Sequence, residues 1–189
     1  MANPTAVVSL AVDNDANAGS LTAEERRQRL RMIEALVFAS AEPVGATELA
    51  GRLPDGTDVA GLLRELQERS GLSLIFITHD FGIVARMCKR AAVMYAGKIV
   101  ETAHVRELFN HPGHPYTQAL MQSVPKVEEI VEKLYSIEGQ PPPLHDLPPG
   151  CTFAPRCPDV SERCRHQYPP SKEIGDAHYV SCWNFVASK

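Results

Sequence analysis

Cysteine and proline gather at one end of this chain, and that asymmetry limits its fold more than any other feature. Cys88 stands alone, whereas the other four cysteines and twelve of the 15 prolines lie from Pro112 onward. Proline-rich sequence cannot bury enough apolar surface to become ordered without a cross-link or a metal. We therefore expect an irregular region from Gly139 to the end, held together by its four cysteines: Cys151, Cys157, Cys164 and Cys182.

Length and charge exclude several classes of protein. The 189 residues suffice for one domain or two small ones. The formal net charge of −4 argues against a broad basic surface for nucleic acid. No apolar run approaches the roughly 20 residues that span a bilayer. The N-terminal residues carry no Lys or Arg before a weakly apolar stretch, so we expect no secretory signal and a cytoplasmic location.

The N-terminal half has the pattern of a helical segment. Residues 1–20 are small and polar and are predicted to be a disordered lead-in, followed by a helical segment over 21–69. Thr22 and Glu25 have the spacing of a capping box, which predicts a helix ending near Ser40. A short helix over 46–53 and a longer one from Asp58 follow. This order is typical of a helix-turn-helix or winged-helix unit, although a plain three-helix packing unit explains it equally well.

The hydrophobic period changes after Leu72. The run Leu-Ser-Leu-Ile-Phe-Ile-Thr predicts a strand that is buried on both faces. A helix through Ile83 and Cys88, a strand over 92–95 and a hairpin to 98–101 then complete a βαβ element of an α/β sheet. Further helices are predicted at about 104–110 and 115–124, and an amphipathic stretch after Pro125.

Residues from about 62 to 189 resemble the C-terminal part of an ATP-binding subunit of oligopeptide/dipeptide ABC importers. The segments that carry the resemblance are LLRELQERSGLSLIFITHDFGIVA, AVMYAGKIVE, HPGHPYTQALMQSVP and GQPPPLHDLPPGCTFAPRCP. The resemblance implies that 70–125 is the end of an ATPase domain and 126–189 a Cys-rich importer region. It also implies a position at the inner face of the cytoplasmic membrane, with permease subunits and a second ATP-binding subunit as partners.

Residues 22–69 are similar to the first winged helix of segregation and condensation protein B. The segments are RMIEALVFASAEPVGATELAGRLP and VAGLLRELQE. This similarity implies an alternative function as a DNA-associated scaffold with a kleisin or condensin-type partner. Two resemblances in one chain lead to the hypothesis of a chimera, a fusion of two truncated genes.

The phosphate-binding motif of ABC ATPases is missing from the sequence. No segment fits G-x-x-x-x-G-K-[ST], because Gly97-Lys98 is followed by Ile99 and preceded at the required distance by Ala92. The signature loop and the acidic strand end that supports Mg²⁺ are missing as well. We therefore expect this fragment not to hydrolyse ATP alone, and ATP with Mg²⁺ to belong to the full-length family.

His79 and Asp80 follow the predicted buried strand, at the edge where open α/β sheets bind ligands. The resemblance implies that His79 is the switch histidine, which contacts the γ-phosphate, and that Asp80 supports the switch loop. Asp80 is also well placed to cap the next helix without any nucleotide.

The four C-terminal cysteines have the spacing C-x5-C-x6-C-x17-C. Four thiolates can bind one zinc ion or the four irons of a cubane cluster. No C-x2-C pair typical of zinc knuckles occurs here, but zinc, free thiols and disulfides remain alternatives. The importer resemblance implies a 4Fe–4S cluster on Cys151, Cys157, Cys164 and Cys182. We expect Cys88 to be a small core residue and His178 to lie near the site or at the surface.

Overall fold

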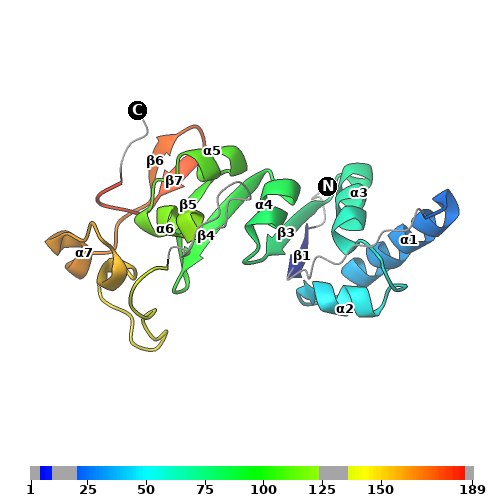
Figure 1. The fold of residues 1–189 in the computed structure, drawn as a ribbon, viewed down its shortest axis with the longest axis horizontal. Coiled ribbons are helices and arrows are strands. Elements are labelled where there is room, and N and C mark those ends of the chain that lie inside the picture. The colour runs from blue at the N-terminus through cyan, green and yellow to red at the C-terminus, as the bar shows by residue number, and fades with distance from the viewer. Residues whose placement is uncertain (1–4, 10–20, 124–135, 186–189) are drawn as a thin grey trace. The chain divides into compact units, whose positions relative to one another are not determined.

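The chain divides into two compact units, which we call the N-terminal unit (Met1–Cys88) and the C-terminal unit (Lys89–Lys189) (Figure 1). A computed structural model describes residues 5–9, 21–123 and 136–185. The amphipathic stretch predicted after Pro125 lies outside these residues. In the described ranges no helix has the length and apolar character needed to cross a membrane.

The N-terminal unit combines helices with a small parallel sheet. Its elements are β1 (Thr5–Ser9), α1 (Ala23–Ala39), β2 (Val44–Gly45), α2 (Ala46–Gly51), α3 (Val59–Ser70), β3 (Ser73–Ile77) and α4 (Phe81–Met87). The strand order is β2–β1–β3, and both pairs are parallel. Strand β1 corrects the prediction of a disordered lead-in for residues 5–9, and the rest of that predicted segment lies outside the described residues. The partners of β1 are distant in sequence, so local composition did not reveal the pairing.

The helices predicted from Thr22, over 46–53 and from Asp58 are confirmed as α1, α2 and α3, and the predicted capping box of α1 is present. The backbone N–H of Thr22 donates to Glu25 Oε2 at 2.8 Å, and the N–H of Glu25 donates to Thr22 Oγ1 at 3.3 Å, which completes the capping box. The apolar stripes of α1, α2 and α3 form the core of the unit: Leu30, Ile33, Val37, Leu49, Val59, Leu62, Leu63 and Leu66. Apolar residues at helical spacing therefore build the core of this segment.

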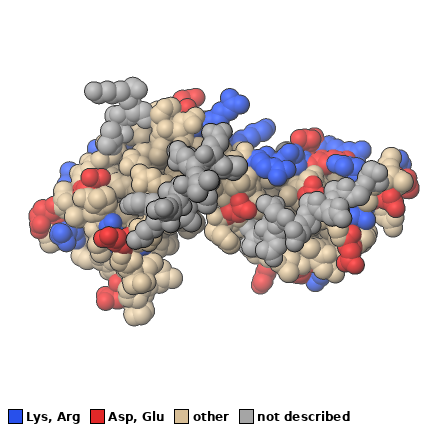
Figure 2. Space-filling view, viewed as in Figure 1, with Lys and Arg blue, Asp and Glu red and all other residues tan. Residues whose placement is uncertain are grey.

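The surface of these helices carries both signs of charge (Figure 2). Arg26 and Arg69 both pair with Glu65, and Arg52 pairs with Glu48.

The strands β2 and β3 each pair in parallel with β1, an arrangement different from the antiparallel wing of a winged helix. The winged-helix interpretation of this segment stays a prediction.

Strand β3 is half-buried, and the prediction that both of its faces are covered is wrong. Ile75 is 50% exposed and Ile77 is 57% exposed, whereas Leu74 and Phe76 pack against the core. The alternation arises because only one face of β3 lies on the helical core. A continuous apolar run therefore does not by itself show that a strand is covered on both sides.

The C-terminal unit is built around an antiparallel sheet. Its elements are β4 (Arg90–Tyr95), β5 (Lys98–His104), α5 (Val105–Asn110), α6 (Pro115–Ser123), the 3₁₀ turn η1 (Ala154–Arg156), α7 (Glu162–His166), β6 (Lys172–Gly175) and β7 (His178–Val180). The strand order is β4–β5–β7–β6 (Figure 1). The prediction of an irregular tail is thus wrong in part, because β6 and β7 extend the sheet that β4 and β5 begin.

The predicted hairpin is confirmed, but the predicted βαβ element is not. Ala96 and Gly97 have φ values of 46° and 76°, which is the pattern of a two-residue hairpin turn. This turn gives β4 a local antiparallel partner in β5. Strand β3 belongs to the other sheet, so no parallel crossover joins β3 to β4. Strand β4 pairs with its neighbour along the chain, β5, and closing this short turn costs less conformational entropy than closing a long crossover from β3.

Candidate metal centre

Four cysteines from separate parts of the C-terminal unit line one cavity. Cys151 lies before η1, Cys157 follows η1, Cys164 lies on α7 and Cys182 follows β7. The cavity wall also includes His114, Phe153 and Trp183. All four cysteines are free thiols. The fold therefore places the four cysteines that the spacing had marked as a candidate site in the wall of one cavity.

A close backbone approach at Gly150 helps to hold two of these cysteines together. The N–H of Cys151 donates to the carbonyl oxygen of Cys164 at 2.8 Å. A Cβ at position 150 would collide with that same carbonyl oxygen and with the carbonyl carbon of Arg165. Only glycine lets the two segments pack this closely, so residue 150 is part of the support of the site.

Hydrogen-bond donors surround the sulfur atoms. Backbone N–H groups two residues further on favour the thiolates of three cysteines, from Phe153 to Cys151, from Asp159 to Cys157 and from Asn184 to Cys182. The last of these measures 3.4 Å from N to Sγ. The fourth thiol, Cys164, lies 3.1 Å from the hydroxyl of Ser161. Donors around sulfur stabilise negative charge and are a recurring device in cysteine–metal sites.

Burial opposes the thiolate form in the absence of a cation. Desolvation raises the pKa of Cys157 and of Cys182 to about 11, and raises that of Cys151 above its ordinary value. Each of these thiols is further disfavoured as an anion by the neighbouring cysteines.

Among the residues that the structure describes, no three His, Cys, Asp or Glu side chains converge on a single ion position.

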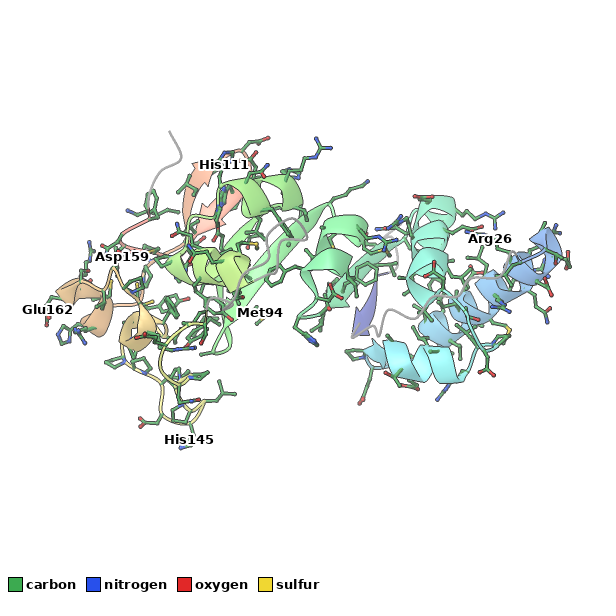
Figure 3. All side chains as sticks on the ribbon, viewed as in Figure 1. Arg26, Met94, His111, His145, Asp159 and Glu162 are labelled. Carbon is green, nitrogen blue, oxygen red and sulfur yellow. The ribbon has the colours of Figure 1, made fainter. Side chains whose placement is uncertain are left out.

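The segment around α7 is bounded by charged and aromatic side chains. Glu162 is the first residue of α7, the helix that carries Cys164, and Asp159 lies just before this helix (Figure 3). The guanidinium of Arg163 stacks on the Trp183 ring at 3.4 Å, and the indole N–H of Trp183 donates to the carbonyl oxygen of Gln167. These contacts fix Trp183 as one wall of the cavity.

A buried carboxylate next to this region was missed by sequence reasoning. Glu101 on β5 is 1% exposed. It accepts hydrogen bonds from the N–H groups of Gly113 at 2.7 Å and His114 at 2.9 Å, and Nε2 of His178 lies 2.7 Å from its Oε1. His178 is itself buried, which corrects the option of a surface position. The signal available in the sequence was a single acidic residue between the apolar pair Ile99 and Val100 and the small residues Thr102 and Ala103 of one strand.

His114 combines deep burial with one unpaired nitrogen. Its Nδ1 accepts a hydrogen bond from the N–H of Tyr116 at 3.0 Å, while Nε2 is buried and has no partner within the described residues. Burial lowers the pKa of His114 to about 4. The nearby His111, by contrast, is exposed and pairs with Glu107 at 3.1 Å. Only one of the two histidines of the HPGHP segment therefore contributes to the cavity wall.

His79 and Asp80 lie in the N-terminal unit, between β3 and α4. His79 is exposed. Asp80 is the N-cap of α4, and its Oδ1 accepts from the N–H of Gly82 at 2.7 Å and of Ile83 at 3.1 Å. The capping interpretation of Asp80 is confirmed. Cys88 at the end of α4 is partly buried against the core of the unit, and burial raises the pKa of its thiol.

The N-cap at Asp80 is expected to contribute measurably to the stability of the N-terminal unit. Replacing Asp80 with alanine leaves two N–H groups of α4 without their acceptor, so we expect the N-terminal unit to lose about 1 kcal/mol of stability. Asp80→Asn keeps an acceptor oxygen at the same position and is expected to lose much less. Urea unfolding followed by circular dichroism gives both values. Equal losses in the two variants would show that the cap bonds contribute nothing.

A known protein family matches part of the C-terminal unit. Residues 100–164 match the family model described as oligopeptide/dipeptide transporter, C-terminal region. This oligopeptide/dipeptide transporter region begins within β5 and ends at Cys164, so it contains three of the four cavity cysteines. Glu101 and His114 also lie inside it, whereas His178 and Cys182 lie beyond its end.

Curated relatives extend this likeness over most of the chain. The dipeptide transport ATP-binding protein DppD of Bacillus subtilis is 38% identical over 162 residues, which cover 83% of this chain and 47% of the relative. The probable peptide ABC transporter ATP-binding protein y4tR of Sinorhizobium fredii is 44% identical over 161 residues, covering 83% and 48%. A putative peptide import ATP-binding protein of Brucella ovis is 36% identical over 175 residues, covering 86% and 51%.

The chain spans about half the length of these relatives. A match that covers 86% of the chain must also extend into residues 22–61, N-terminal to the boundary that the importer resemblance suggested. The comparisons therefore give no support to a chimera with its junction near residue 62. They do not bear on the similarity to segregation and condensation protein B, which stays a prediction.

Proposed function

We propose that this chain is part of an ATP-binding subunit of a peptide ABC importer, peripheral at the inner face of the cytoplasmic membrane. The observation that carries the proposal is the importer-type region over 100–164, supported by relatives named as peptide-transport ATP-binding proteins. Its partners are then the membrane permease subunits and a second ATP-binding subunit.

In this proposal His79 is the switch histidine and acts only beside a nucleotide that other residues hold. An exposed imidazole at the end of β3 can donate a hydrogen bond to a γ-phosphate oxygen. The sequence has no glycine-rich phosphate loop to hold that phosphate, because Lys98 is followed by Ile99. The chain alone is therefore proposed to be unable to hydrolyse ATP.

We further propose that the four cavity cysteines hold a 4Fe–4S cluster, with a single zinc ion as the alternative metal. The donor set fits, since four free thiols line one cavity and three of them receive N–H groups from two residues further on. A bound cluster supplies positive metal centres that stabilise thiolates, and can also supply one-electron chemistry. The protein's own contribution is to hold the sulfur atoms and exclude water from them.

Two experiments test the proposed function: retention of a permease by the tagged chain, and phosphate release from Mg–ATP. The tagged chain is mixed with detergent-solubilised permease subunits of a peptide importer encoded in the same genome, with a permease of an unrelated sugar importer as the control. We expect retention of the peptide permease alone. In parallel, phosphate release from Mg–ATP by the chain alone is expected to stay at the buffer background, both for the wild type and for His79→Ala.

Two results would contradict this proposal in different ways. Failure to retain the peptide permease would remove the importer assignment. Phosphate release above background that disappears in His79→Ala would show instead that this chain already contains a working nucleotide site.

A further inference from the structure

The side chain of His114 is held in a fixed orientation at the wall of the cysteine cavity. The residue is 1% exposed and lies directly before α6. Its backbone N–H donates to Glu101 Oε2 at 2.9 Å. Its ring accepts from the N–H of Tyr116 through Nδ1 at 3.0 Å, and the ring lies 5.9 Å from that of Phe153, centroid to centroid. Two hydrogen bonds and a ring contact therefore constrain the imidazole.

The hydrogen bond to Nδ1 decides which ring nitrogen carries the proton. A ring nitrogen that accepts from a backbone N–H has no hydrogen of its own, and a neutral imidazole has its hydrogen on the other nitrogen. The hydrogen of His114 is therefore on Nε2. This atom is a donor, and it is buried without an acceptor among the residues that the structure describes.

A buried donor without a partner is costly. Such a group has lost its hydrogen bonds to water and gained none in return, and native proteins rarely tolerate it without a functional reason. His114 lines the same cavity as Cys151, Cys157, Cys164 and Cys182. Once these thiols are bound to metal, their sulfur atoms carry negative charge and can accept a hydrogen bond from a donor in the cavity wall.

We propose that the Nε2–H group of His114 donates a hydrogen bond to a sulfur atom of the metal site in this cavity. The proposal rests on the proposed 4Fe–4S cluster and gives this histidine a positioning and tuning role, with no place among the metal ligands. Donors to sulfur stabilise the more negatively charged, reduced state of such sites. The hydrogen bond of His114 therefore raises the reduction potential.

Two substitutions separate the unpaired donor from the rest of the histidine. In His114→Asn, the short side chain keeps an acceptor for the N–H of Tyr116, two residues further on, but has no donor at the place of Nε2. In His114→Gln, the longer side chain brings an amide N–H to about that place. His111→Asn is the matched control, since His111 is exposed at the end of α5, apart from α7 (Figure 3).

The full-length chain and its variants are reconstituted anaerobically with iron and sulfide, and their midpoint potentials are measured by spectroelectrochemical titration. Loss of a hydrogen bond that is about 1 kcal/mol stronger in the reduced than in the oxidised state changes the oxidised-to-reduced ratio about fivefold at fixed potential. We expect the midpoint potential of His114→Asn to be lower than that of the wild type by the amount that corresponds to this ratio. The midpoint potential of His114→Gln should return toward the wild-type value, and that of His111→Asn should not change. If His114→Asn loses its iron, the proposal requires His114→Gln to regain it.

The possible failures are distinguishable. Iron-loaded wild type and His114→Asn with equal potentials would overturn the hydrogen bond and leave the cluster in place. Loss of iron in both His114 variants would overturn it as well, because the donor would then not be what matters. A wild-type chain that retains no iron after reconstitution would overturn the cluster and, with it, this inference.

Discussion

Replacing Glu101 with alanine is expected to destabilise the C-terminal unit by about 3–5 kcal/mol, the cost of breaking a buried charged network by removing one partner. The Glu101 carboxylate accepts from two backbone N–H groups, of Gly113 and His114, and contacts the imidazole of His178. Its removal leaves three buried polar groups without a partner. The lost bonds connect β5 to β7 and to the turn before α6, so the damage reaches three elements.

Guanidinium unfolding measures this effect, with the fluorescence of Trp183 as the signal, since the chain has one tryptophan and it lies in this unit. Glu107→Ala is the matched control. Glu107 also pairs with a histidine, His111, but both side chains are about half exposed and the pair contributes little. We expect the control to change stability by less than about 0.5 kcal/mol. A Glu101→Ala variant as stable as this control would show that the network does not stabilise the unit.

Substitution of a single cavity cysteine is expected to remove most of the bound iron. Anaerobically reconstituted wild type should hold about four iron atoms per chain and absorb near 400 nm, as a 4Fe–4S cluster on four thiolates requires. In Cys157→Ala one of the four ligands that line the cavity is gone. We expect less than half of the iron to remain, with loss of the absorption band.

Cys88→Ala is the control for this measurement, because Cys88 is a cysteine of the other unit. It should bind as much iron as the wild type. One zinc per chain with no iron would assign the site to the alternative metal. A wild-type chain without either metal, prepared without oxygen, would contradict the metal site altogether.

The sequence predicted well the elements that depend on neighbours along the chain. The caps at Thr22 and Asp80, the apolar faces of α1 and α3 and the hairpin at Ala96–Gly97 all follow from short-range spacing. Each depends on residues that are only a few positions apart, so periodicity and turn chemistry suffice to find them.

Pairings between distant segments were not predictable in the same way. Strand β1 pairs with β3, and β7 pairs with β5, each across a large separation in sequence. Nothing local marks Thr5–Ser9 as a partner for Ser73–Ile77. The proline-rich composition of the tail also hid β6 and β7, since composition averages over a region and these strands have only four and three residues.

In the candidate site, too, some residues could be predicted from the sequence and others could not. Cysteine spacing identified all four sulfur positions, because cysteine is rare and carries its chemistry in its own side chain. The supporting residues were missed. Glu101, His114 and Gly150 matter through burial, an unpaired nitrogen and a close backbone approach, and all three are properties of the folded unit.

The contact between Glu101 and His178 closes a separation of 77 residues. On a translating ribosome, which adds roughly 5–20 residues per second, the carboxylate must wait roughly 4–15 seconds for this partner to be synthesised. During that interval the nascent hairpin of β4 and β5 has no β7 beside it, and Glu101 can bond to the N–H groups of Gly113 and His114 but not to His178. A chaperone that binds this unfinished sheet therefore has to do so before the segment with β7 and His178 leaves the exit tunnel.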